Sequence, residues 1–164
     1  MTPRTSRTSE EPRAPARALD DVLFVVGRVY FNYVGVVERV LKDKKIDHLI
    51  APGMSQILFA LFEKDDRIIK EIAERVGLSQ STLTGLLTRM EKSGLIDRKR
   101  DAVDGRAVRI RLTTLGRSLE DRCWNVLEEM RSLVRKALSD DETASLRDGL
   151  NKLSASLRAK AEED

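Results

Sequence analysis

Residues 68–112 read IIKEIAERVGLSQSTLTGLLTRMEKSGLIDRKRDAVDGRAVRIRL, and this stretch decides the fold. Apolar residues recur at three- and four-residue spacing over Ile68–Val76, which predicts a helix with one apolar face. Gly77 should end that helix, because glycine readily adopts the left-handed conformation found after a helix C-terminus. Ser79 is a suitable N-cap for a second helix over Gln80–Lys92, since its hydroxyl can accept a free backbone N–H. The stretch is therefore a candidate helix-turn-helix.

The second helix has an apolar face of leucine and methionine and a polar face of short hydrogen-bonding side chains. Besides the N-cap Ser79, the outward residues are Gln80, Ser81, Thr82, Thr84, Thr88 and Arg89. Short polar side chains at the start of such a helix allow close approach to base edges in the major groove of DNA. We therefore expect these residues to contact bases or phosphates.

A basic hairpin follows the second helix. After Gly94 the apolar period shortens to two, which predicts strands at Leu95–Asp101 and Arg106–Leu112, and Asp104–Gly105 is a strong signal for the turn between them. The hairpin has a net charge of +3, from Arg98, Lys99, Arg100, Arg106, Arg109 and Arg111 against Asp97, Asp101 and Asp104. A basic hairpin directly after a helix-turn-helix is typical of a winged helix. Its wing can follow the DNA backbone and insert an arginine into the minor groove.

Helices and a tail are predicted on the N-terminal side. Residues 1–18 are rich in proline, arginine, serine and threonine, which favours a disordered tail, with a basic arm on the DNA backbone as the alternative. Leu19–Leu41 should form a long helix that is apolar on more than one side, so two surfaces should cover it. A shorter helix should begin within Ala51–Gly53, because proline suits a first helical position.

Two helices are also predicted on the C-terminal side. Thr113 is a candidate N-cap for a helix to about Leu138, and Ser139 with Glu142 forms a capping box for a last helix to about Lys160. These helices extend beyond the core that the helix-turn-helix could supply. Pairing with the long first helix of a second copy would bury them, so we expect a homodimer.

The fold class predicted from these patterns is mainly α, an α+β winged helix with a helical dimerisation arm. The domains follow as a tail (1–18), a dimerisation region (19–47 and 113–164) and a DNA-binding domain (48–112).

Composition narrows the function. The chain has 164 residues, of which 41% are hydrophobic and 35% charged, as suits a helical protein with a small core. The single cysteine, Cys123, fits a reducing cytoplasm and should be a small buried apolar residue. No apolar run could span a membrane, so we expect a cytoplasmic protein without a membrane partner. With one histidine, His48, expected in a surface loop, no metal cluster or cofactor motif is recognisable, and we expect no enzymatic activity.

Taken together, these residues resemble the multiple-antibiotic-resistance regulator (MarR) family over about residues 19–160. The matching motifs are Glu71–Ala73, Gly77–Thr84, Gly94–Arg98, Asp104–Ala107 and Leu112–Arg117. The resemblance implies a homodimeric transcription factor that binds a pseudo-palindromic operator in double-stranded DNA, usually as a repressor. It also implies release of the DNA by a small phenolic or anionic effector, as in many relatives.

The resemblance also implies roles for particular residues. Arg106 matches the minor-groove arginine of the wing, and Asp104 matches the acid that orients it, physically able to pair with Arg98, Arg100 or Arg106. Arg98, Arg100 and Arg109 are further expected DNA contacts. Gly85 departs from the family, because many members have a basic residue there. It either allows close approach of the backbone to DNA or removes one contact.

An effector site is the least defined expectation. Tyr30, Tyr33, Met54 and Trp124 are candidates for lining it, although large residues at helical spacing also suit a core or a dimer interface. Peroxide sensing is not supported, because the only cysteine lies far along the chain from the tyrosines. The alternative functions are a winged-helix protein-interaction module and an activator without a ligand. Arginine side chains on the wing favour DNA over a protein partner.

Overall fold

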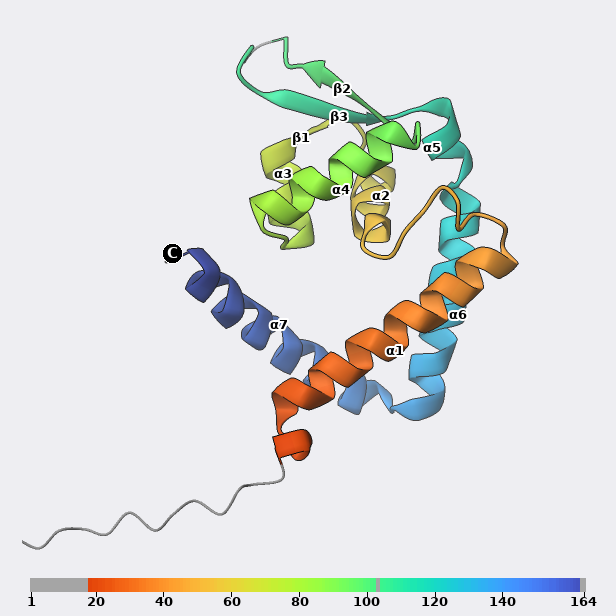
Figure 1. The fold of residues 1–164 in the computed structure, drawn as a ribbon, viewed down its shortest axis with the longest axis vertical. Coiled ribbons are helices and arrows are strands. Elements are labelled where there is room, and N and C mark those ends of the chain that lie inside the picture. Colours follow the sequence, from red (N-terminus) through yellow and green to blue (C-terminus); the bar gives the residue numbers. More distant parts are fainter. Residues whose placement is uncertain (1–17, 103, 163–164) are drawn as a thin grey trace, which may run out of the picture. The chain divides into compact units, whose positions relative to one another are not determined.

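The computed structural model describes residues 18–102 and 104–162, so the predicted tail lies almost wholly outside the described residues. The chain divides after Val36 into two units. The helices (Figure 1) are α1 (Val22–Asp43), α2 (Met54–Glu63), α3 (Ile69–Val76), α4 (Gln80–Lys92), α5 (Thr114–Ser118), α6 (Glu120–Ala137) and α7 (Asp140–Glu162). The strands are β1 (Arg67–Ile68), β2 (Ile96–Arg100) and β3 (Val108–Leu112). The fold is mainly helical with a small sheet, which confirms the predicted class.

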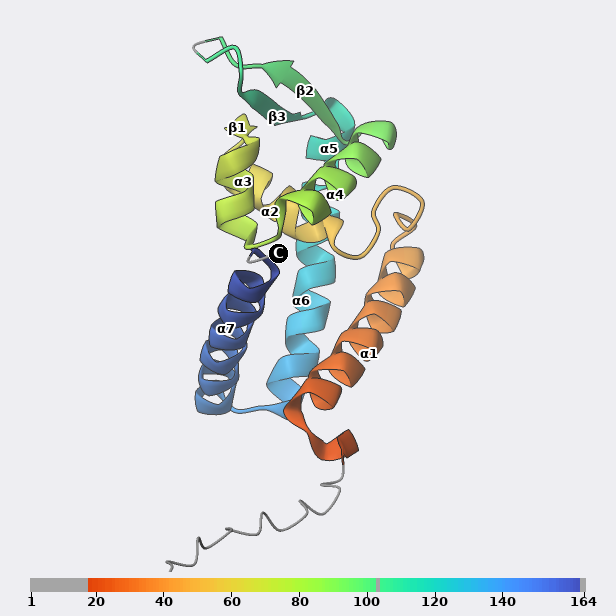
Figure 2. The ribbon, with the colours of Figure 1, turned by 60° about the vertical axis from the view of Figure 1, so that its left-hand side comes forward.

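The sheet has three antiparallel strands in the order β1-β3-β2. Ile96 lies opposite Leu112 and Arg100 opposite Val108 in the hairpin, while Arg67 of β1 pairs with Ile110. Both predicted hairpin strands are shorter than expected: β2 lacks Leu95 and Asp101, and β3 lacks Arg106 and Ala107. The two-residue β1 was not predicted. Figure 2 shows the β2–β3 hairpin extending beyond α3 and α4 as a wing.

The core of the second unit lies between α2, α3, α4 and the inner side of the sheet. Its most deeply buried members include Ile57, Leu58, Leu61, Ile72, Leu83, Leu87, Met90, Leu95, Ile96 and Ile110. The apolar faces predicted for α3 and α4 are therefore the buried faces. Because these faces fix both helices against the sheet, the polar face of α4 and the wing are held in one structure.

Local signals at the helix ends are largely confirmed. Gly77 has a φ of 67°, in the left-handed region, and the hydroxyl of Ser79 accepts the N–H of Thr82 at 3.3 Å. The hydroxyl of Thr113 accepts the N–H of Gly116 at 3.0 Å. At the start of α7, a carboxylate oxygen of Glu142 accepts the N–H of Ser139 at 2.9 Å.

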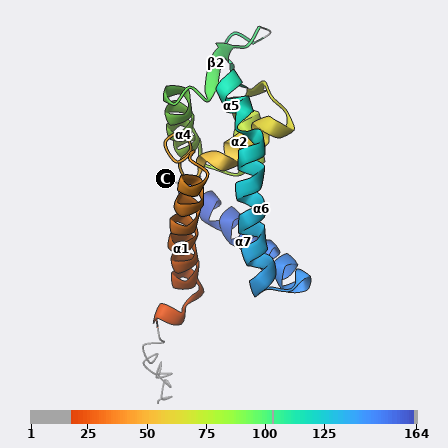
Figure 3. The same ribbon diagram turned by 90° about the vertical axis from the view of Figure 1, so that its right-hand side faces the viewer.

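Three predicted helices differ from those in the structure. The helix expected from Ala51–Gly53 begins only at Met54, because Gly53, with a φ of 90°, still belongs to the preceding turn. The first long helix begins at Val22, after a short 3-10 helix at Ala18–Asp20, and it ends at Asp43 rather than Leu41. The helix expected from Thr113 to Leu138 is interrupted at Leu119, and Figure 3 shows α5 and α6 as successive segments.

Apolar side chains remain uncovered on the terminal helices. In the first unit, Leu23, Phe24, Tyr30 and Phe31 of α1 are exposed, Phe31 by 75%. In the second unit, Leu133 and Val134 of α6 and Leu146, Leu150 and Leu157 of α7 are also exposed. Exposed apolar side chains of this kind can mark an interaction site, and the dimerisation role of these helices stays a prediction.

Candidate nucleic-acid interface

The polar face of α4 is exposed where the sequence predicted it. Ser79, Gln80, Ser81, Thr82, Thr84 and Arg89 are all exposed, and Thr88 is half-buried. The hydroxyl of Thr84 donates to the carbonyl of Gln80 at 2.8 Å, and that of Thr88 donates to the carbonyl of Thr84 at 2.9 Å. These bonds hold the threonine side chains close to the helix backbone. At these threonines the surface of α4 is therefore polar and its side chains project little, which allows a helix to approach base edges in the major groove.

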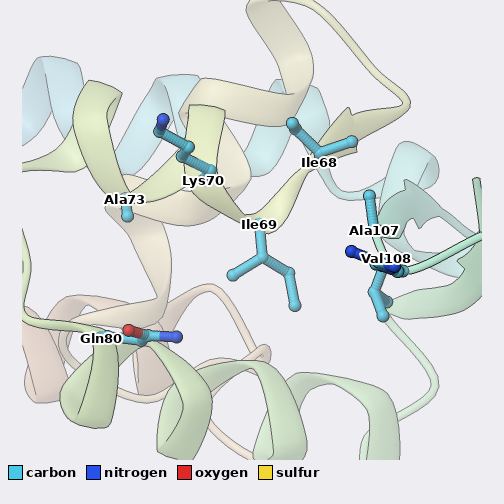
Figure 4. Close-up of a pocket in the computed structure, with 8 residues that line it drawn as sticks. Ile68, Ile69, Lys70, Ala73, Gln80, Ala107 and Val108 are labelled. Atoms are coloured by element: carbon cyan, nitrogen blue, oxygen red, sulfur yellow. The ribbon is translucent and has the colours of Figure 1, made fainter. Parts of the chain in front are cut away.

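A groove joins the start of α4 to the wing (Figure 4). It has a volume of about 500 Å³ and is lined by Ile68, Ile69, Lys70, Ala73, Gln80, Arg106, Ala107 and Val108. Gln80 and Arg106 therefore belong to one surface, although they come from different elements. Lys70, an exposed residue of α3, is a cation of this surface that our sequence analysis did not include. The inward positions of Ile69 and Ile72 already placed Lys70 outward, so the helical period could have identified it.

The wing turn presents Arg106 to solvent. The N–H of Asp104 donates to a carboxylate oxygen of Asp101 at 2.7 Å, and the N–H of Arg106 donates to the carboxylate of Asp104 at 3.0 Å. The N–H of Ala107 also donates to the carbonyl of Asp104, at 2.8 Å. Asp104 thus shapes the turn through backbone N–H groups, and it forms none of the predicted side-chain pairs with the arginines in the described residues. The guanidinium of Arg106 is left exposed at the tip.

The basic residues of the wing fall into two groups. Arg98 donates to the hydroxyl of Thr88 at 3.0 Å and lies 3.0 Å from the Glu91 carboxylate, both on α4. Arg109 is paired with Asp101 and with the carbonyl of Asp66. By contrast, Lys99, Arg100 and Arg106 are exposed and form no side-chain ion pair or hydrogen bond within the described part of the chain. The cations free to meet phosphate are therefore fewer than the sequence count indicated.

The ion pairs near the wing also shift the pKa values of the residues that form them. A hydrogen bond from Arg111 lowers the pKa of the Asp66 carboxyl below its ordinary value, and Asp66 in turn raises the pKa of the Arg111 guanidinium. A hydrogen bond from Arg75 likewise lowers the pKa of Glu63. Both shifts favour the charged carboxylates that these ion pairs require.

The four candidate effector residues are distributed over both units. Tyr30 and Tyr33 belong to the first unit, where burial raises the pKa of the Tyr33 hydroxyl. Met54 and Trp124 belong to the second. Met54 is 3% exposed and is part of the core, whereas Trp124 is 43% exposed and packs edge-on against Phe59 with ring centroids 4.9 Å apart. A pocket shared by all four residues stays a prediction.

The remaining candidate residues are structural. Cys123 is buried as expected, and burial raises the pKa of its thiol to about 11. His48 is exposed in the loop before α2, as predicted. Among residues 18–102 and 104–162 there is no group of three or more histidine, cysteine, aspartate or glutamate side chains that could hold a metal ion. Nor is any helix in these residues long and apolar enough to cross a membrane.

A helix-turn-helix with an exposed polar second helix, flanked by a wing with a basic tip, defines a winged-helix DNA-binding protein. The MarR family model matches residues 55–108. The chain is 31% identical over 159 residues to the transcriptional regulator TtmR of Methylorubrum extorquens, covering 97% of this chain and 79% of that protein. It is 29% identical to the repressor IacR of Pseudomonas putida, over 87% of this chain and 84% of the relative.

A solved structure shares the fold. The PcaV transcriptional regulator of Streptomyces coelicolor, determined in complex with its natural ligand, superimposes with a TM-score of 0.75 at 22% identity. The match covers 87% of this chain and 97% of that one. The chain belongs to the MarR family and is a DNA-binding transcriptional regulator, not an enzyme. The family resemblance and the function class drawn from the sequence are both confirmed.

Proposed function

We propose that the protein is a homodimeric repressor that binds a pseudo-palindromic operator. Each α4 enters the major groove of one half-site, and each Arg106 enters the adjacent minor groove. The observation that carries this proposal is that Gln80, at the start of α4, and Arg106 of the wing line one groove although they come from different elements. Arginine in a narrow minor groove is attracted by its enhanced negative potential, so the wing tip would select DNA shape.

The dimer is supported by the exposed apolar residues of α1, α6 and α7. A twofold dimer is the simplest closed assembly that covers them, and it places two copies of α4 on one side of the duplex. The centres of the two half-sites should then lie about 10 base pairs apart, one helical turn. Repression is supported by the similarity to IacR, which is a transcriptional repressor, and an effector by the natural ligand bound to PcaV.

Selection from a random duplex library with the full-length protein tests the proposal. The expected result is one enriched motif with twofold symmetry, bound by a species with the mass of a dimer in analytical ultracentrifugation. Enrichment of no motif, or binding by a monomer, would contradict it. Repression is tested separately, by placing the selected duplex between a promoter and a reporter gene: expression should fall when the protein is present.

The role of Arg106 is tested with matched variants. Arg106→Ala should weaken binding to the selected duplex by about tenfold or more and reduce the slope of log affinity against log salt by about 1. Arg122→Ala removes an exposed arginine of α6 without a partner in the described residues, so it should leave both quantities unchanged. Equal effects of the two variants would remove the wing tip from the mechanism.

A further inference from the structure

Two consecutive acidic residues, Asp65 and Asp66, connect α2 to β1, and we name them the acidic turn. One oxygen of Asp65 accepts the backbone N–H of Leu112 at 2.9 Å, and the other accepts from Arg117 at 2.5 Å. A carboxylate oxygen of Asp66 accepts from Arg111 at 2.6 Å. The acidic turn therefore binds β3 and Arg117 of α5, which lie more than 40 residues further along the chain.

The backbone of the acidic turn is arranged for this contact. Asp66 has a φ of 59°, in the left-handed region that aspartate and asparagine adopt more readily than most residues. Its N–H donates to the Asp65 carboxylate at 2.8 Å, which fixes one side chain against the next residue. The carbonyl of Asp66 then accepts from Arg109 at 2.6 Å. Backbone and side-chain oxygens of the same two residues thus face the wing strand.

Arg109 continues this set of contacts toward the wing tip. Its guanidinium also donates to Asp101, which is only 8% exposed and which accepts the N–H of Asp104 at the turn. A chain of charge-assisted bonds therefore connects the acidic turn, through Arg109 and Asp101, to the turn that presents Arg106. Charge-assisted hydrogen bonds of this kind are among the stronger polar contacts in proteins.

We propose that the acidic turn is the positioning element of the wing: it fixes β3, so that Arg109 and Arg111 act on DNA through the placement of Arg106 and not by contacting phosphate. The inference replaces the DNA contact expected for Arg109. The effect on DNA binding through Arg106 rests on the proposed function, whereas the placement of β3 by the acidic turn does not.

For the removal of a carboxylate from the acidic turn, the proposal predicts a change in DNA affinity opposite in sign to the change that electrostatics alone predicts. Removing a negative charge near the DNA-binding surface normally strengthens binding to a polyanion. Loss of an acidic-turn carboxylate should weaken it, because Arg106 is no longer held in place. Asp66→Asn is the suitable change, since asparagine keeps the size of the side chain and tolerates the left-handed backbone.

Asp97→Asn is the matched control. Asp97 is exposed on β2 of the same sheet, and its side chain has no hydrogen bond or ion pair among the described residues. Both variants raise the net charge by one. With the selected duplex and with a mixed-sequence duplex of about 30 base pairs, Asp97→Asn should bind equally or more tightly, and Asp66→Asn at least about fivefold more weakly. Equal or tighter binding by Asp66→Asn would overturn the inference.

Salt dependence separates a positioning residue from a phosphate contact. Arg100→Gln removes an exposed cation and should reduce the slope of log affinity against log salt by about 1. Arg111→Gln should weaken binding while leaving that slope within experimental error of the unmodified protein. A slope reduced equally by both variants would show that Arg111 contacts phosphate, and the inference would fail.

A readout without DNA keeps the structural part testable. Hydrogen exchange of the Val108–Leu112 amides should be about tenfold faster in Asp66→Asn than in Asp97→Asn, at a temperature where thermal unfolding shows both proteins folded. If the unmodified protein binds neither duplex, the proposed function fails, and exchange alone decides the placement of β3. Unchanged exchange in Asp66→Asn would overturn the inference in either case.

Discussion

Replacing Gly85 with alanine should stabilise the free protein and weaken its binding to DNA. Gly85 lies inside α4 on the exposed face, and a β-carbon built there meets no atom within 4 Å. Alanine in a helix interior is favoured over glycine by about 0.5–1 kcal/mol, so the free energy of unfolding should rise by about that amount. For a chain of this size, the melting temperature should increase by about 1–4 °C.

The effect on DNA follows from the low surface around Gly85. The hydroxyls of Thr84 and Thr88 are bonded to the helix backbone, so these side chains stay close to α4. A methyl group added at Gly85 would project from this surface. If the α4 backbone approaches the bases closely there, the methyl group should weaken binding by at least about fivefold, equivalent to about 1 kcal/mol. Fluorescence anisotropy with the selected duplex, at matched protein concentration, measures this change.

Gly149→Ala supplies the control. Gly149 is an exposed helical glycine of α7 with equally open surroundings, so its replacement should give a similar gain in stability and no change in DNA affinity. Unchanged or tighter DNA binding by Gly85→Ala would refute a close approach of the α4 backbone to DNA. The remaining explanation of Gly85 would be that it removes the contact made by the basic residue of many family members. A failure of Gly85→Ala to stabilise, when Gly149→Ala does, would refute the inference that the site is open.

The remaining predictions concern the packing around α5 and α6. Gly116→Ala should lower the free energy of unfolding by about 2 kcal/mol or more, measured by urea denaturation, because its β-carbon would lie 2.1 Å from the carbonyl oxygen of Leu95; a loss below that of an ordinary surface substitution would contradict the backbone contact. Cys123, with a thiol pKa raised to about 11 by burial, should react with a disulfide reagent at pH 8 at least about tenfold more slowly when folded than in urea. Between pH 9.0 and about 11 the unfolded thiol has lost its proton and the folded one has not, so stability should fall as pH rises, and Cys123→Ala should reduce that fall.

The elements with local signals at both ends were predicted best from the sequence. Residues Gln80–Lys92 form α4 as predicted, because Ser79 and Gly94 mark its ends and the apolar period is clear between them. The hairpin was recognised from the Asp104–Gly105 turn and the change of period. The exposed polar face of α4 and the exposed Arg106 followed from the same patterns, which depend on neighbouring residues alone.

The features that the sequence did not reveal depend on distant residues. Leu119 interrupts the C-terminal helix although no proline or glycine occupies that position; just before it, α5 packs through Gly116 against the backbone of Leu95. Arg109 and Arg111 both bond to Asp66, 43 and 45 residues earlier in the chain, although Arg109 also pairs with Asp101 inside the hairpin. Counting charges along the hairpin could not distinguish such paired arginines from the unpaired ones.

The bond between Arg98 and Thr88 has a consequence for the operator. It joins β2 of the wing to α4, so we expect the side chains proposed for the two grooves to keep a fixed spacing. One base pair inserted between the major-groove and minor-groove positions would shift the second position by about 3.4 Å along the duplex and rotate it by about 35°. Side chains held at a fixed spacing cannot follow that displacement, so we expect the spacing of the bases within each half-site to matter for recognition as much as their identity.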